Sequence, residues 1–166
     1  KTAPTGSAAA TTAPNGSNGW YTGNVTVRFT CTDNLSGVVA CPADQLLSTE
    51  GSSVSSTTQT ITDQAGNSSN PSNVVTVKID KTNPSITLAS RTAPNGAGWN
   101  NTNVTLTWNC GDAVSGAASS TVNQVVSSEG NNLSSTGTCT DQAGRTASNT
   151  QSGIKIDKTA PTLSPV

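Results

Sequence analysis

Hydrophobic and polar residues alternate along one stretch in each half of the chain. In residues 25–31 (VTVRFTC) and again in residues 104–110 (VTLTWNC), every second position is apolar. Because successive side chains of a strand point to opposite faces, this period of two predicts a half-buried strand in each stretch. Further strands are predicted at residues 38–41, 46–49, 58–62 and 74–79, between clusters of Gly, Asn, Asp and Pro. Short strands without any helical periodicity favour an antiparallel β-sandwich.

The same pattern is written twice in the chain. KIDKTNP at residues 78–84 returns as KIDKTAP at residues 155–161, and TAPNG, GW, NVT and TDQAG also occur once in each half. Equivalent positions lie about 77 to 80 residues apart, longer than the roughly 20 to 50 residues of solenoid and propeller repeats. The repeat therefore predicts two tandem modules, at residues 1–80 and 81–158, and the start of a next repeat or a linker at residues 159–166.

Composition narrows the possible functions. Leu, Ile, Val and Phe account for 27 of 166 residues, but the formal net charge is only −1, so order is favoured over disorder. Ser, Thr and Asn account for 68 residues, which predicts a hydroxyl- and amide-rich surface. No basic stripe is present to bind nucleic acid, and no long apolar run is present to enter a membrane.

The four cysteines fall as one pair in each module. Cys31 and Cys41 belong to the first module, and Cys110 and Cys139 belong to the second. Their spacings match no zinc-binding pattern of paired cysteines. A module of about 80 residues has a small core, for which disulfides often compensate. We expect one disulfide within each module and hence an oxidising, extracellular setting, with free thiols and pairing between modules as the alternatives.

Several motifs together resemble a known family. GWYTGNVTVRFTCTDNLSGV at residues 19–38, TEG at 49–51, TDQAGN at 62–67 and VKIDKTNP at 77–84 are similar to the bacterial immunoglobulin-like repeats of long extracellular and surface proteins. The resemblance covers nearly the whole chain, twice. It implies an all-β fold of two tandem immunoglobulin-like antiparallel β-sandwiches in an end-to-end array.

The resemblance also implies where the cysteines lie. Cys31 and Cys110 would end the second strand of their modules, Cys41 would lie on the third strand and Cys139 on the sixth. The third and sixth strands are neighbours in the opposite sheet, so both disulfides would cross the sandwich. Residues 6 and 8 would belong to a weak opening strand in the first module, and residues 86 and 88 to a stronger one in the second.

Acidic residues recur at equivalent positions of the two modules and permit two interpretations. In an immunoglobulin-like sandwich the loops that carry Asp112 and Asp141 share one end, where the preceding linker with Asp80 also arrives, so these three carboxylates could bind calcium at the junction. The simpler interpretation is that the aspartates cap backbone N–H groups of tight turns. No other cofactor is expected.

Functional expectations follow from what the chain lacks. Without histidine, and with acidic residues confined to turns, no catalytic constellation can be assembled, so we expect no enzyme activity. Trp20 and Trp99 are expected to pack in the core or at the junction rather than to stack on sugars. The prediction is a bacterial, extracellular stalk of repeated modules, whose partners are neighbouring modules of the same chain. The alternatives are an adhesive module for a glycan or a surface protein, and a subunit of a self-assembling filament or coat.

Overall fold

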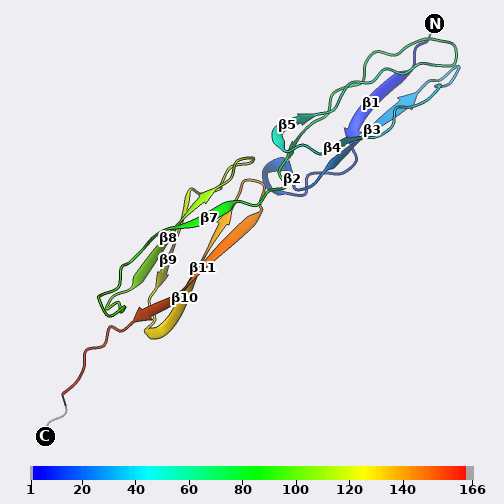
Figure 1. Ribbon diagram of the computed structural model, residues 1–166. Coiled ribbons are helices and arrows are strands. Elements are labelled where there is room, and N and C mark those ends of the chain that lie inside the picture. The colour runs from blue at the N-terminus through cyan, green and yellow to red at the C-terminus, as the bar shows by residue number, and fades with distance from the viewer. Residues whose placement is uncertain (1, 164–166) are drawn as a thin grey trace. The chain divides into compact units, whose positions relative to one another are not determined.

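The computed structural model describes residues 2–163, which form two compact units divided between Thr82 and Asn83 (Figure 1). Both units are built from β-strands, and the described part contains no helix beyond the single 3₁₀ turn Ser17–Gly19. The prediction of an all-β chain is thus confirmed. Residues 164–166, the last of the predicted next repeat or linker, lie outside the described residues.

The first unit contains two three-stranded sheets. One has the order β1-β3-β4 and the other the order β2-β6-β5. Only β2 and β6 pair in parallel, and the other neighbours are antiparallel. The strands are β1 (Thr5–Ala10), β2 (Trp20–Tyr21), β3 (Val25–Thr32), β4 (Gln45–Leu47), β5 (Gly51–Ser55) and β6 (Thr76–Ile79).

The second unit repeats this plan with longer strands. One sheet has the order β7-β8-β9, the other is the hairpin β10-β11, and all of these pairs are antiparallel. A parallel bridge between Asn100 and Ile156 takes the place of the β2–β6 pair. The strands are β7 (Ser85–Arg91), β8 (Val104–Gly111), β9 (Thr121–Val126), β10 (Gly130–Thr140) and β11 (Thr146–Ile156).

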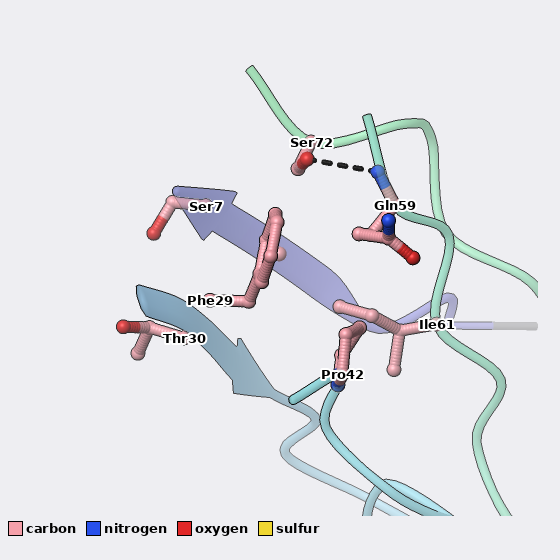
Figure 2. A pocket seen from close by; sticks show the side chains of 8 residues that line it. Ser7, Phe29, Thr30, Pro42, Gln59, Ile61 and Ser72 are labelled. Carbon is pink, nitrogen blue, oxygen red and sulfur yellow. Dashed lines mark hydrogen bonds between the residues drawn. The ribbon is translucent and has the colours of Figure 1, made fainter. Parts of the chain in front are cut away.

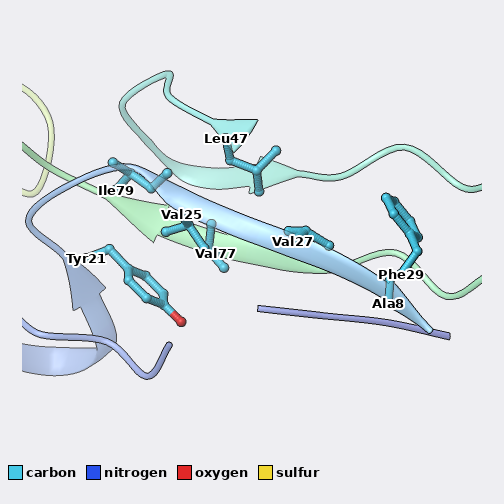
Figure 3. Close-up of a cluster of buried hydrophobic side chains, with 8 residues drawn as sticks. All are labelled: Ala8, Tyr21, Val25, Val27, Phe29, Leu47, Val77 and Ile79. Atoms are coloured by element: carbon cyan, nitrogen blue, oxygen red, sulfur yellow. The ribbon is translucent and has the colours of Figure 1, made fainter. Parts of the chain in front are cut away.

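The core of each unit lies between its two sheets, as the alternating pattern predicts. In β3 the alternate residues Val25, Val27 and Phe29 are buried, and they pack with Val77 and Ile79 of the other sheet (Figure 3). In the second unit the cluster is Val104, Leu106, Trp108, Ile154 and Ile156. Each such side chain contributes about 1.5–3 kcal/mol by leaving water.

Two of the predicted strands are wrong in the first unit. Residues 38–41 form no strand, since Val38 makes only an isolated bridge to Asp63. Residues 58–62 also lie outside the strands, although the equivalent part of the second unit belongs to β10. The predicted strand at 46–49 is instead Gln45–Leu47, and β5 was not predicted at all.

Pro71 explains why the first unit has no counterpart of the long β10–β11 hairpin. Proline has no N–H to donate to a ladder, and the 63–78 segment is also one residue longer than its counterpart 141–155. Serine hydroxyls satisfy the backbone instead, because Gln59 N donates to Ser72 Oγ and Ile61 N donates to Ser69 Oγ, both at 3.0 Å. Figure 2 shows the Ser72 bond beside Phe29 and Ile61.

Candidate functional site

Both disulfides join cysteines of the same unit. Cys110 on β8 bonds Cys139 on β10, so this disulfide connects the two sheets of the second unit. Cys31 on β3 bonds Cys41. The expectation that Cys41 lies on a strand is wrong, because it lies in the irregular segment between the Val38 bridge and β4.

The packing of Ile61 explains why the disulfide partner differs between the units. Ile61 occupies the position equivalent to Cys139, and its side chain fills the space next to Gly6, where an added Cβ would lie 2.3 Å from Ile61 Cδ1. The second unit has Ile86 opposite Cys110, in the position of Gly6 opposite Cys31. The large side chain of Ile86 on the first strand of the second unit is thus exchanged for that of Ile61 in the first unit, and the disulfide partner changes with it.

Asp33 and Asp112 cap the same turn in the two units. Asp33 Oδ1 accepts hydrogen bonds from the N–H groups of Leu35, Ser36 and Gly37 at 3.0, 2.8 and 2.8 Å. Asp112 Oδ1 accepts three bonds of 2.8–2.9 Å from the equivalent residues 114–116. Glycine is required at the end of this turn, since Gly37 and Gly116 have φ values of 80° and 85°. The prediction that these aspartates cap turns is confirmed.

Asp63 and Asp141 form a second, more deeply buried pair of equivalent residues. They are 1% and 2% exposed, and each accepts a bond from the backbone N–H four residues later, at 2.7 and 2.8 Å. Asp63 Oδ2 also accepts a bond from the side chain of Asn67, at 2.7 Å. Asp141 Oδ2 is buried without any hydrogen-bond partner in the described residues.

The structure places the three predicted calcium ligands in different units. Asp112 and Asp141 belong to the second unit, where oxygens of their carboxylates lie within 4.8 Å of each other. Asp80 follows β6 in the first unit, where its N–H donates to Tyr21 O and its Oδ1 accepts a bond from Thr82 N. The calcium site at the junction stays a prediction.

The capping bonds lower the pKa of several of these carboxyls. The N–H groups of Gly37 and Leu35 hold the pKa of Asp33 below its ordinary value. Burial raises the pKa of Asp112, but the N–H groups of Gly116 and its neighbours outweigh it, so the net pKa is lowered. The same balance of burial against bonds from Asn67 lowers the pKa of Asp63.

These shifts predict that stability declines in acid. A carboxyl whose pKa is lower in the folded state stabilises the fold above its unfolded pKa of about 3.9, and this contribution is lost as the pH falls through the lower folded value. We expect the urea midpoint to fall as the pH drops below about 4. In the second unit, Asp112→Asn should flatten this dependence because the titrating cap is gone. Parallel pH profiles for the variant and the natural chain would contradict the assignment.

A third pair of equivalent acidic residues, whose role was not predicted from the sequence, fixes the segment that leaves each unit. In the first unit the carboxylate of Glu50 accepts bonds from Lys81 N and from Thr82 Oγ1. In the second unit Glu129 accepts the same bonds from Lys158 N at 2.6 Å and from Thr159 Oγ1 at 3.1 Å. The sequence signal for this contact was that TEG or SEG and IDKT occur together in both units. The two motifs lie about 30 residues apart, so no rule for neighbouring residues predicts that they touch.

Trp20 and Trp99, which follow glycine-rich turns, pack against the protein rather than projecting into solvent. Trp20 is only 5% exposed, and Lys78 Nζ lies 5.6 Å from its ring centroid. Lys155 lies 5.8 Å from the half-buried ring of Trp99 in the same way. The expectation that Trp20 packs rather than stacks on a sugar is confirmed by its burial.

Two recesses of the described residues differ in their lining and in their size. A recess of ≈ 520 Å³ in the second unit is lined by residues 91–94, Gly98, Gly153 and Lys155, which provide no acid–base pair. The gap lined by Phe29, Pro42 and Ile61 (Figure 2) does not admit a water molecule. Among the described residues, no helical segment has the length and hydropathy of a membrane span.

Comparison with known proteins adds no assignment to this geometry. No model of a known protein family matches the chain, and no curated protein matches it. The two disulfides indicate an oxidising environment.

Proposed function

We propose that the chain is a non-catalytic extracellular spacer, in which immunoglobulin-like modules are linked by connections held against the modules themselves. The observation that carries this proposal is the exit clamp, the set of hydrogen bonds that fixes the IDKT segment of each unit to Glu50 or Glu129. An array whose connections are fixed in this way holds another domain at a distance more effectively than one joined by flexible linkers.

The exit clamp binds the departing chain through both backbone and side chains. Besides the bonds to Glu50, Lys81 Nζ donates to Ser48 O at 2.7 Å and to Asn24 Oδ1 at 3.2 Å. Lys158 repeats these contacts with Ser127 O at 2.6 Å and Asn103 Oδ1 at 3.2 Å. Most of these bonds are exposed to solvent, where a hydrogen bond contributes about 0.5–1.5 kcal/mol, so it is their number that restricts the segment.

The segment that enters each unit is also bound. Asn67 Nδ2 donates to Thr2 O at 3.3 Å, and the equivalent Arg145 donates through Nε to Asn83 Oδ1 at 2.9 Å. Pro4, two residues after Thr2, and Pro84, directly after Asn83, fix φ where the first strand of each unit begins. Few residues of the connection between the two units are therefore without a contact to one of them.

Three features support the immunoglobulin-like class within this proposal. Each unit has its core between two sheets, a short early segment pairs in parallel with the last strand, and the second disulfide joins the sheets. The oxidising environment that the disulfides indicate fits an extracellular location. The resemblance to bacterial surface repeats supports the same setting.

The test removes the clamp between the units and compares it with the equivalent clamp at the far end. Glu50→Ala frees the connection between the units, whereas Glu129→Ala frees only the segment after the second unit. Both variants should lose about 1–3 kcal/mol of unfolding free energy. Only Glu50→Ala should broaden the distribution of inter-unit distances measured by small-angle scattering and by spin labels placed one in each unit.

The comparison decides whether the clamp has a role beyond local stability. Equal distance distributions for Glu50→Ala, Glu129→Ala and the natural chain would show that the clamp does not stiffen the connection. The spacer proposal would then lose the observation on which it depends.

A further inference from the structure

Asp141 holds a buried carboxylate oxygen that no group of the protein satisfies. The residue is 2% exposed, its Oδ1 accepts a bond from Arg145 N at 2.8 Å, and its Oδ2 has no hydrogen-bond partner in residues 2–163. The large majority of buried side-chain polar atoms in proteins have a hydrogen-bond partner. Burying a carboxylate oxygen without a partner costs more free energy than burying a neutral polar atom, so the Asp141 oxygen needs a specific explanation.

A second carboxylate makes the environment of this oxygen more negative. Oxygens of Asp112 and Asp141 lie within 4.8 Å of each other. The hydrogen bonds from the turn to the Asp112 carboxylate all go to its Oδ1. Arg145, four residues after Asp141 in the sequence, donates through Nε to Asn83 and forms no ion pair with either aspartate. Among the described residues, the one ion pair is Arg28 with Asp44 in the first unit.

The first unit repeats the arrangement with one difference. Asp33 and Asp63 take the places of Asp112 and Asp141, and again one buried oxygen, Asp33 Oδ2, has no hydrogen-bond partner. There, however, the amide of Asn67 donates to Asp63 Oδ2, the oxygen equivalent to the open one of Asp141. The second unit therefore has the more open pair of carboxylates.

We propose that Asp112 and Asp141 bind a calcium ion within the second unit, with Asp141 Oδ2 and a carboxylate oxygen of Asp112 as ligands. Calcium prefers oxygen ligands and tolerates irregular geometry, so backbone carbonyls and waters can complete its shell of six to eight oxygens. Magnesium demands a near-ideal octahedron and gives up its waters reluctantly, which fits a two-carboxylate turn site less well. The site requires only residues of one unit and does not depend on the spacer role.

The first experiment measures binding directly on the whole chain. After treatment with chelator, calcium is titrated while amide shifts are followed by NMR, with Asp44→Asn as the control, because Asp44 pairs with Arg28 on the surface. We expect the largest shifts in residues 112–116 and 141–145 and their loss in Asp141→Asn. Absence of shifts up to about 10 mM calcium, well above the roughly 0.1–1 mM typical of extracellular sites, would overturn the proposal.

The unfolding temperature provides a second readout. The sign of its change in Asp141→Asn separates calcium binding from a purely structural role of the aspartate. In chelator, Asp141→Asn should unfold at the same or a higher temperature than the natural chain, because it removes a buried charge next to Asp112. In calcium the natural chain should gain stability by ligand binding and the variant should not. An equal calcium response in the variant, or equal binding of magnesium by the natural chain, would contradict the assignment. Scattering by Glu50→Ala in chelator tests the spacer role separately.

Discussion

Replacing both Cys110 and Cys139 by alanine is expected to lower the unfolding free energy of the second unit by about 3.5 kcal/mol. The disulfide closes a loop across 29 residues and joins the two sheets. In the chain-entropy account, removing such a cross-link gives the unfolded chain back the conformational freedom that the loop had taken away. Urea unfolding followed by tryptophan fluorescence in a Trp20→Phe background reports on the second unit, because the remaining tryptophans, Trp99 and Trp108, both belong to it.

The first disulfide provides the matched comparison. Cys31 and Cys41 are separated by 10 residues, so the same account predicts a loss of about 2.7 kcal/mol for their double alanine variant. The expected order is therefore a larger loss in the second unit than in the first. An unchanged urea midpoint for Cys110→Ala with Cys139→Ala would contradict a stabilising role for the disulfide.

The alternation of apolar residues predicted the core strands correctly because it is a local property. β3 and β8 bury alternate side chains because a strand places every second residue on one face, and this requires no knowledge of partners. The cysteine count similarly predicted one disulfide in each unit. Caps such as Asp33 and Asp112 were within reach because their donors lie two to four residues away.

The features that the sequence did not reveal depend on distant contacts. Residues 58–62 carry a strand-like pattern, but Pro71 on the neighbouring segment removes the donor that a ladder would need. The resemblance placed Cys41 on a strand, but residues 40–44 pair with no neighbouring strand, and only the fold reveals this. The Glu50 clamp links residues more than 30 positions apart.

Comparison of the two units shows that substitutions in contact compensate each other. Gly6 with Ile61 in the first unit corresponds to Ile86 with Cys139 in the second. Arg28 with Asp44 corresponds to the cross-strand neighbours Thr107 and Asn123, so a charged pair is exchanged as a whole for a neutral one. The fold is thus retained while neighbouring side chains change together. The largest such exchange is in the core, where Trp108 of the second unit takes the position of Phe29 in the first.

Truncating Trp108 to alanine is expected to cost about 3–5 kcal/mol of unfolding free energy in the second unit. The side chain is fully buried among Leu106, Ile154 and the other residues of the core cluster, so its loss leaves a large cavity. The equivalent Phe29→Ala removes a smaller ring that is 6% exposed, and we expect a smaller loss in the first unit. Calorimetry of the two variants compares them in the same chain, and a loss below 1 kcal/mol for Trp108→Ala would contradict this account of the core.

Gly137 gives this prediction a second test, in which the sign of the effect depends on the ring. An added Cβ at Gly137 would lie 2.5 Å from Trp108 Cδ2 and 2.7 Å from Cε3, whereas the first unit has Gln59 at the equivalent position, beside the smaller Phe29. Gly137→Ala should therefore cost about 1–3 kcal/mol of unfolding free energy, because a rigid indole cannot yield without moving the core.

In the Trp108→Phe background the same change should be neutral, or stabilising by about 0.5–1 kcal/mol, because alanine restricts a strand backbone better than glycine. The coupling energy from this double-mutant cycle then measures how strongly the large ring requires the glycine. Additive effects would mean that the indole and Gly137 do not constrain each other, and the exchange between the two units would need another cause.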